Sequence, residues 1–179
     1  MRPGPSGYLS AVWVRHQLQF LPTSGLSRAK AFGNVPARFV LLQRHMNATP
    51  EIEELTEKVI GCAIEVHRIL GPGLLESVYR ECMLIEMRRE SLRVASEQHV
   101  PLDYKGQRIG GGLKLDLLVD GCVVVELKAV ERLHPIHLAQ VITYLKLTGY
   151  PAGLLMNFNS TTLRAGLRRL NHPDRYVKR

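Results

Sequence analysis

Residues 113–128 constrain the fold of this chain more than any other stretch. Two runs rich in apolar residues flank the dipeptide Asp-Gly at positions 120 and 121, and Asp-Gly between such runs is a strong β-hairpin signal. Three charged residues, Asp116, Glu126 and Lys128, are set into these runs. Ionised groups are costly to bury unless they pair or bind a metal. The hairpin therefore predicts a functional site.

The loop length of this hairpin decides whether its acids meet. A two-residue turn places Asp116 opposite Val125, whereas a three-residue loop with Gly121 in the left-handed conformation pairs Asp116 with Glu126. Side chains alternate along a strand, so Glu126 and Lys128 share a face in either case. Only the three-residue arrangement makes a metal site. We therefore predict an odd loop length or a bulge.

The composition is that of an ordinary globular protein. The chain has 179 residues, of which 45% are hydrophobic and 22% charged, and no apolar run approaches the ~18 residues of a membrane span. Its three cysteines, Cys62, Cys82 and Cys122, lie in apolar segments without metal-ligand spacing. They are expected to be buried thiols in a reducing compartment, the cytoplasm. No cysteine and histidine cluster or dinucleotide-binding glycine pattern supports a redox role.

The net charge of +8 is unevenly distributed. Residues 1–50 carry six basic and no acidic residues, residues 51–163 carry 12 basic and 15 acidic, and residues 164–179 carry six basic and one acidic. A nucleic-acid signal is therefore confined to the C-terminal segment, where Arg164, Arg168 and Arg169 are candidate phosphate contacts. A solvated, frayed terminus is the alternative.

Residues 1–45 show no sustained helical or strand periodicity. We interpret them as a disordered or non-native extension, with an upstream start codon ahead of Met46, although an organellar transit peptide has a similar composition. Residues 46–179 are expected to form a single domain.

Hydrophobic periodicity within this domain predicts alternating helices and strands. Helices are expected at about 50–70, 74–90 and 135–148, and strands at 97–104, in the hairpin and at 153–158. The second helix is expected to bury Leu75, Val78, Cys82, Ile85 and Met87. The glycines at 110–112 are expected to form a flexible opening to the hairpin, strand 153–158 to lie parallel to the Glu126 strand, and residues 163–170 to be either strand or helix.

The candidate site residues suit a hard divalent cation. The carboxylates of Asp116 and Glu126 and the carbonyl of Leu127 are ligands that Mg²⁺ or Mn²⁺ accepts. Lys128 can orient a water or offset negative charge in the transition state. Glu76, at a helix start, can complete the ligand set directly or through water.

Three further polar residues are placed to support this site. Tyr79 lies one turn from Glu76, and Gln140 and Tyr144 lie one turn apart on the third helix. Each candidate has an ordinary structural alternative: an exposed ion pair for Glu126 and Lys128, a favourable helix-dipole contact for Glu76, core packing for Tyr79, and a solvated face for the last two.

Taken in order, these residues resemble a known family. Asp116 followed by Glu126-Leu127-Lys128 resembles the motif of the PD-(D/E)XK nuclease superfamily, with Leu115 in place of the usual proline. Gln140 and Tyr144 are spaced as in the extra motif of its recombination-nuclease branch. Gly73, Glu76 and Tyr79 match the signature of the bacterial GxxExxY proteins, and the resemblance covers about residues 51–170.

This resemblance implies an α/β, restriction-endonuclease-like core with a mixed central sheet flanked by helices. It implies Mg²⁺ or Mn²⁺ held by Asp116 and Glu126, Lys128 as the catalytic lysine, and Glu76 as the helix-borne acid. The implied function is a nuclease acting on DNA in repair, recombination or defence. The alternative is a nuclease-fold module that binds nucleic acid or protein without turnover.

Overall fold

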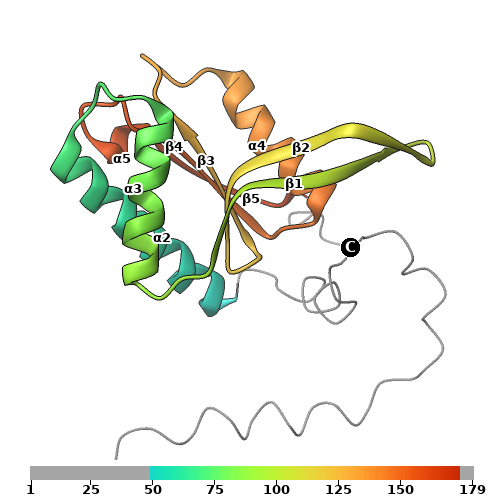
Figure 1. The fold of residues 1–179 in the computed structure, drawn as a ribbon, viewed down its shortest axis with the longest axis horizontal. Helices are drawn as coiled ribbons and strands as arrows, with labels where there is room; N and C mark the ends of the chain where they lie inside the picture. The colour runs from blue at the N-terminus through green and yellow to red at the C-terminus, as the bar shows by residue number, and fades with distance from the viewer. Residues whose placement is uncertain (1–48, 174–179) are drawn as a thin grey trace, which may run out of the picture. The chain divides into compact units, whose positions relative to one another are not determined.

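The computed structural model describes residues 49–173, which form one five-stranded sheet in the order β1-β2-β3-β4-β5 with helices on its faces (Figure 1). Neighbouring strands run antiparallel except for β3 and β4, which are parallel. The expected mixed sheet of an α/β fold is therefore present. The elements are α2 (Pro50–Leu70), α3 (Glu76–Arg89), β1 (Val94–Tyr104), β2 (Gln107–Val119), β3 (Val123–Lys128), α4 (Pro135–Thr148), β4 (Ala152–Asn157), α5 (Leu163–Gly166) and β5 (Leu167–Asn171).

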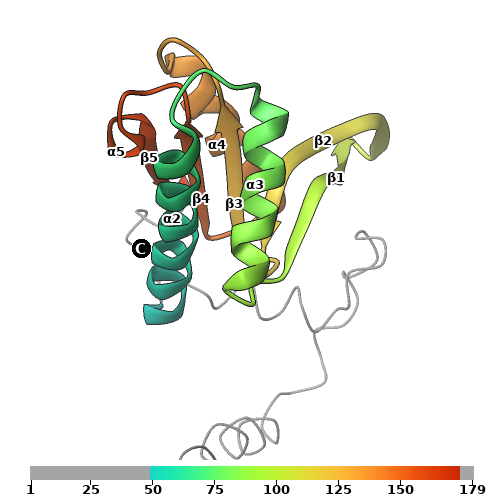
Figure 2. The ribbon, with the colours of Figure 1, turned by 60° about the vertical axis from the view of Figure 1, so that its left-hand side comes forward.

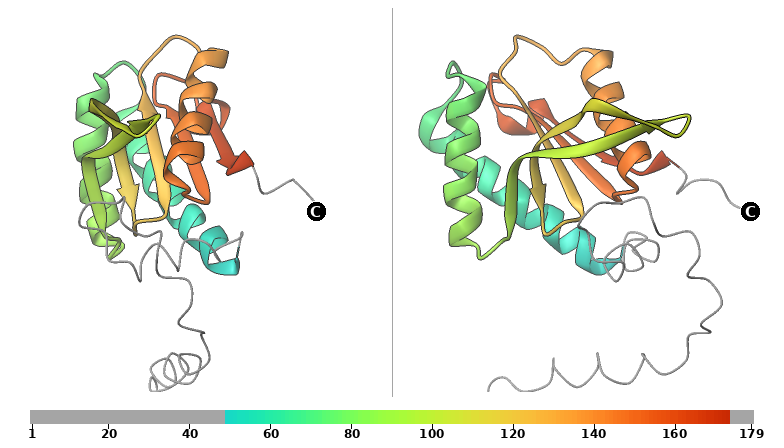
Figure 3. Two further views of the ribbon diagram at one scale, coloured as in Figure 1. Left: turned by 90° about the vertical axis from the view of Figure 1, so that its right-hand side faces the viewer. Right: turned by 45° about the vertical axis from the view of Figure 1, so that its right-hand side comes forward.

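Two helices cover one face of the sheet and one covers the other. Helices α2 and α3 lie side by side in front of β3 and β4 (Figure 2), and α4 lies behind the sheet (Figure 3). The core accordingly falls into two clusters, one containing Val59 of α2 and Met83 of α3, the other containing Val141 and Leu145 of α4. Because β3 and β4 are covered on both faces, nearly every residue in them is buried.

The central hairpin has the predicted odd loop. Val119 pairs with Val123, so three residues, 120–122, form the loop. Asp120 and Gly121 both adopt positive φ, 47° and 67°. This register brings Asp116 and Glu126 to neighbouring positions. The regular pairing of the two strands stops at Leu117 with Val125, so β2 and β3 separate just where the acidic residues begin.

Helix α4 occupies the span that the sequence predicts. It begins at Pro135, which suits a first turn because proline lacks an N–H that would be unpaired there. It ends at Gly149, which has a φ of 77° and donates its N–H to the carbonyl of Leu145. The following strand β4 pairs in parallel with β3, as expected. The undecided segment 163–170 contains both elements, because the single turn α5 leads directly into β5.

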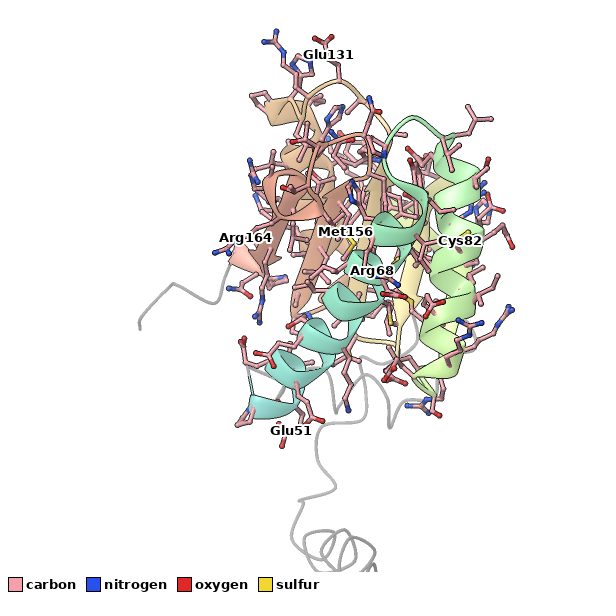
Figure 4. The ribbon with its side chains drawn as sticks, turned by 90° about the vertical axis from the view of Figure 1, so that its left-hand side faces the viewer. Glu51, Arg68, Cys82, Glu131, Met156 and Arg164 are labelled. Atoms are coloured by element: carbon pink, nitrogen blue, oxygen red, sulfur yellow. The ribbon has the colours of Figure 1, made fainter. Side chains whose placement is uncertain are left out.

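The buried face of α3 differs from the prediction. Leu75, Val78 and Ile85 are 74%, 40% and 48% exposed, whereas Tyr79 and Met83 are fully buried. The reason is that the Tyr79 ring stacks on the Phe158 ring, with 4.5 Å between the ring centroids. This contact orients α3 so that Leu75, Val78 and Ile85 face outward. Figure 4 shows this outer side of the molecule, with Cys82 on α3 and Arg68 on α2, and Met156 of β4 behind α2.

Strands β1 and β2 continue beyond the rest of the sheet as a two-stranded arm, residues 98–114 (Figure 1). Its tip is the turn Lys105-Gly106, both at positive φ. The glycines 110–112, expected to be a flexible opening, are part of β2. The pairing shifts between Val100 and Leu102, and this irregularity admits the glycine-rich segment into the strand.

Some expectations fall on residues outside the described range. These are the extension 1–45 and the basic residues Arg175, Lys178 and Arg179. Within residues 49–173, no helix is both long and apolar enough to cross a membrane.

Candidate active site

Glu126 is the buried carboxylate at the centre of the site. It lies on the inner strand β3 and is 2% exposed. One of its oxygens, Oε1, accepts a hydrogen bond of 2.5 Å from the Lys128 ammonium, while Oε2 is buried with no hydrogen-bond partner among the described residues. The pKa of Glu126 is raised to about 7 by burial, then by Asp116 and Glu76, against the opposing effect of Lys128. A buried carboxylate with an unpaired oxygen has a strong tendency to take up a cation or a proton.

Asp116 faces the same point from β2. Its Oδ2 accepts a hydrogen bond of 2.9 Å from the backbone N–H of Leu127, so its carboxylate takes the place of a strand carbonyl where β2 and β3 separate. The N–H and C=O of one extended residue point to the same side of its strand. The Leu127 carbonyl therefore faces Asp116, as a shared metal site requires.

Lys128 supplies the positive charge of the site. Its side chain is 14% exposed. Burial alone would lower the pKa of its ammonium, but the carboxylates of Glu126, Glu76 and Asp116 outweigh burial and raise it. The ammonium is thus held in its charged form. It has three N–H donors, and only the one to Glu126 is accounted for by a described side chain.

Glu76 enters the site from the first turn of α3. Burial raises the pKa of its carboxyl, Lys128 lowers it, Asp116 raises it and Arg80 lowers it. These effects place Glu76 within electrostatic range of Lys128 on β3 and Asp116 on β2. Electrostatic range therefore relates Glu76 to Asp116, Glu126 and Lys128, while the direct contacts are those of Glu126 with Lys128 and of Asp116 with the Leu127 N–H.

Arg80 is a site residue that the sequence analysis missed. It follows Glu76 by one helical turn, its side chain is 18% exposed, and its Nη1 lies 4.0 Å from Asp116 Oδ1. Nη2 lies 3.6 Å from Glu97, which also pairs with Lys114 at 2.5 Å. The spacing of Glu76 and Arg80 at i and i+4 was the only available signal, because the register that brings Glu97 opposite Asp116 depends on the fold.

Gln140 and Tyr144 approach the site from α4. The Gln140 amide donates to the Tyr144 hydroxyl at 2.8 Å. Burial raises the pKa of Tyr144, the bond from Gln140 lowers it, and Glu126 and Asp116 raise it. The phenol is therefore protonated and retains its own O–H as a donor. Their i, i+4 spacing makes the contact expected from the sequence.

Tyr79 supports the site from outside it. Its hydroxyl donates to the carbonyl of Gly71 at 2.7 Å and accepts from the N–H of Leu74 at 3.1 Å. These bonds fix the loop in which Gly73 adopts a φ of 104°, and the loop in turn sets where α3 begins at Glu76. The spacing of Gly73, Glu76 and Tyr79 thus has a structural explanation in a loop, its anchor and the acid it positions.

The C-terminal arginines are largely engaged within the protein. Arg169 forms a two-pronged ion pair with Glu53. Arg168 donates to the carbonyls of Ala165 and Leu167. Arg164 is exposed (Figure 4). The nucleic-acid role assigned to them from the sequence stays a prediction, and of the three Arg164 is the best suited to it.

The donor set fits a hard dication only in part. Among residues 49–173, no three His, Cys, Asp or Glu side chains converge so as to hold a metal ion by themselves. Two carboxylates, one backbone carbonyl and waters are nevertheless the usual protein share of a Mg²⁺ site. The unpaired buried Oε2 of Glu126 is the observation that fits such an ion.

The chain was compared with protein families, with curated proteins and with solved structures. The family model for the PD-(D/E)XK nuclease superfamily matches residues 53–170. No curated protein and no solved structure gives a significant match. The matched range contains every site residue described above.

Proposed function

This chain belongs to the PD-(D/E)XK nuclease superfamily, and from that membership we propose that it is a metal-dependent nuclease that hydrolyses phosphodiester bonds in DNA. The observation that carries the proposal is the buried Glu126, whose Oε2 has no hydrogen-bond partner within residues 49–173 and whose Oε1 accepts from Lys128. A structural ion pair would leave no such oxygen, whereas a carboxylate that binds a cation needs one.

Asp116, Glu126 and the Leu127 carbonyl would hold Mg²⁺ or Mn²⁺, with Glu76 as a direct or water-linked addition. When bound, such an ion supplies Lewis acidity toward a phosphoryl oxygen and lowers the pKa of a coordinated water. The Leu127 N–H orients Asp116 through its 2.9 Å bond. Burial of the carboxylates excludes water that would compete for the same charges.

Lys128 and Tyr144 supply the remaining chemistry. The Lys128 ammonium is kept charged by three carboxylates. Its N–H groups that are not bonded to Glu126 donate hydrogen bonds to an attacking water or to a non-bridging phosphate oxygen. The Tyr144 O–H, which accepts a hydrogen bond from Gln140, is a neutral donor supplied by α4. Donors fixed before the reaction stabilise developing negative charge without reorganisation.

The finer assignments belong to the same proposal. They are membership of the GxxExxY group, a role in repair, recombination or defence, Mg²⁺ or Mn²⁺ as the cofactor, and phosphate contacts by Arg164 and Arg168. The free thiols of Cys62, Cys82 and Cys122 support a cytoplasmic location.

The test is cleavage of plasmid, linear, single-stranded and branched DNA during titration with Mg²⁺ and Mn²⁺. Glu126→Gln keeps the size and the acceptor for Lys128 but removes the charge, and we expect it to abolish cleavage. Glu57→Gln makes the same change at an exposed site on α2 and serves as the matched control. Metal-independent cleavage, or equal cleavage by Glu126→Gln, would refute the proposal.

A second candidate is a module that binds without turnover. The observation that favours it is that cations of the protein already sit beside both acids, Lys128 at 2.5 Å from Glu126 and Arg80 at 4.0 Å from Asp116. DNA binding that persists in Glu126→Gln, together with no cleavage by the unmodified chain at any metal concentration, would support it.

A further inference from the structure

The β1–β2 arm, residues 98–114, has features that the fold itself does not require. Val100 near its base packs against the core cluster under α4, whereas of residues 101–111 all but Leu102 are exposed. The arm projects past α4 (Figures 1 and 3). Isolated two-stranded hairpins are only marginally stable in water, so a protruding ribbon of this length calls for a partner.

Two of its glycines are required neither by their backbone conformation nor by lack of space for a side chain. Gly110 and Gly111 have ordinary φ, and a Cβ built on either meets nothing within 4 Å. Gly112 differs, because its φ is 55° and a Cβ there would come within 2.4 Å of the Val100 carbonyl. Glycine weakens a strand interior and often marks a close approach by a ligand or another backbone. Gly110 and Gly111 lie in the bulge between Ile109 and Leu113, where β2 has no Cα partners on β1, so their backbone is bare of side chains.

The charge of the arm is opposite to that of the rest of the domain. It carries Lys105, Arg108 and Lys114 against Asp103, a net charge of +2, whereas the rest of the described residues 49–173 has twelve basic and fourteen acidic residues, a net charge of −2. At its tip, Tyr104 is 62% exposed and the Lys105 ammonium lies 5.5 Å from its ring centroid. The arm therefore carries a net positive charge, whereas the rest of the described chain carries a net negative charge.

A second copy of the chain is a poor occupant for this surface. Strand β1 is an edge strand, but Pro101 removes one N–H from that edge and the pairing is irregular between Val100 and Leu102. Proline and bulges at an edge protect it from pairing with another strand. A polyanion fits the charge, and the major groove of B-DNA, about 12 Å wide, admits a two-stranded β-ribbon. The major groove of duplex RNA is too narrow for side chains to read.

We infer that the arm lies in the major groove of the DNA duplex being cleaved, with the bare backbone at Gly110 and Gly111 against the sugar-phosphate chain and Lys105 on a phosphate near the tip. The inference rests on the proposed function, because the same duplex is held at the carboxylates. The base of the arm is at Glu97, which contacts Arg80 beside Asp116. The seven residue steps of strand from Glu97 to Tyr104 span about 23 Å, or roughly seven base pairs of duplex. The arm therefore selects duplex that extends to one side of the cut.

The first test measures the affinity of the full chain for a DNA duplex of about three helical turns, without divalent metal, by fluorescence anisotropy. Changing both Gly110→Val and Gly111→Val favours strand structure but fills the bare backbone, and we expect the thermal midpoint to stay equal or rise while affinity falls about tenfold, the effect of losing roughly one good phosphate or stacking contact. Gly61→Ala fills equally open space on α2 and should leave affinity unchanged.

A second variant keeps the test decisive if the valines disturb folding. Lys105→Asn improves the turn, since Asn tolerates the φ of 49° at this position, and removes one charge. The slope of log affinity against log salt should fall by about one. Affinity and salt slope that both match the unmodified chain would overturn the inference, as would absence of duplex binding, or a dimer that the valine variant abolishes while DNA binding persists.

Duplex length separates this inference from the nuclease proposal. Shortening the duplex to fewer than about seven base pairs on one side of the binding site should weaken binding by the unmodified chain but not by the valine variant. Cleavage that is indifferent to the arm variants would refute the arm contact and leave the nuclease standing. Arm-dependent binding without cleavage would do the reverse.

Discussion

Asp116 Oδ2 accepts the backbone N–H of Leu127 at 2.9 Å, across the gap where β2 and β3 part. The side chain of one strand thereby completes the hydrogen bonding of the next, and the carboxylate is fixed beside the Glu126 that precedes Leu127. The same hydrogen bond therefore accounts for both the separation of β2 from β3 and the position of Asp116 beside Glu126.

Changing Asp116 should separate the structural from the chemical part of this bond. Asp116→Asn retains an acceptor for Leu127, so we expect a loss of less than about 1 kcal/mol in the free energy of unfolding, whereas Asp116→Ala leaves a buried N–H unpaired and should cost about 1–3 kcal/mol. Both should abolish metal-dependent cleavage. Urea unfolding and cleavage assays on the same preparations measure this, and equal stability of the two variants would contradict it.

Arg80 should compete with the metal. Its Nη1 is 4.0 Å from Asp116 Oδ1 and it lowers the pKa of Glu76, so it stabilises the carboxylates when no ion is bound. Removing a neighbouring cation changes a partly exposed site by on the order of 1 kcal/mol. We expect Arg80→Met to bind Mn²⁺ about fivefold more tightly in calorimetry and Arg80→Lys to behave like the unmodified chain. Weaker binding by Arg80→Met would show instead that Arg80 positions the ligands.

Most of this architecture follows from local sequence signals. Helix α4 lies at its predicted residues because Pro135 and Gly149 mark its ends, and the odd hairpin loop follows from the need to bring Asp116 beside Glu126. The predicted buried face of α3 was right at Met87 but wrong at Leu75, Val78 and Ile85, because these form as regular an apolar stripe as Tyr79, Met83 and Met87. Only the tertiary contact of Tyr79 with Phe158 decides between the two stripes.

The site was predictable wherever its residues are close in sequence. Glu126 and Lys128 share a strand face, and Gln140 and Tyr144 share a helix face, so periodicity alone relates each pair. Arg80 and Glu97 were missed because their meeting depends on how α3 lies against β1 and on the β1–β2 register. Ion pairs between distant elements leave no periodic signal in a single sequence.

Tyr79 should matter for stability before it matters for chemistry. Tyr79→Phe keeps the ring against Phe158 but leaves the Gly71 carbonyl and the Leu74 N–H without their partner. We expect a loss of about 1–3 kcal/mol in the free energy of unfolding and a reduced cleavage rate because Glu76 is less firmly placed. Chemical denaturation measures the first effect. An unchanged unfolding midpoint would mean that the loop is held by other contacts.

Glu126 should make stability depend on pH in a defined direction. Its pKa rises from the ordinary 4.5 to about 7 because of burial and then Asp116, so the folded state binds the proton more tightly than the unfolded state. The contribution of Glu126 to stability is therefore greatest below pH 4.5, falls as pH rises toward 7, and levels off above it. We expect Glu126→Gln to be more stable than the unmodified chain at pH 8, by at most roughly 3 kcal/mol, because the pKa of about 7 already includes the attraction to Lys128.

Urea unfolding at pH 5 and pH 8 tests this prediction, with Glu57→Gln as the exposed control. Added Mg²⁺ should raise the thermal midpoint of the unmodified chain more at pH 8 than at pH 6, because the ion competes with the proton on Glu126. No such rise is expected in Glu126→Gln. Stability of that variant below the unmodified chain at pH 8 would mean that the pair with Lys128 outweighs burial.

Tyr144 should affect turnover rather than binding. Its O–H is a protonated donor held by Gln140 at 2.8 Å and lying within electrostatic range of Glu126 and Asp116. A donor aimed at developing charge contributes about 10²–10³ in rate when removed from a closed oxyanion site. This one is only part-buried, so we expect Tyr144→Phe to lower kcat roughly 10-fold to 100-fold with little change in KM. Gln140→Leu, which frees the hydroxyl without removing it, should lower kcat less, since the donor remains but is no longer oriented. Single-turnover cleavage at saturating enzyme isolates the chemical step from binding. A change in KM alone would assign Tyr144 to substrate binding, and equal losses in the two variants would place the essential group on Gln140.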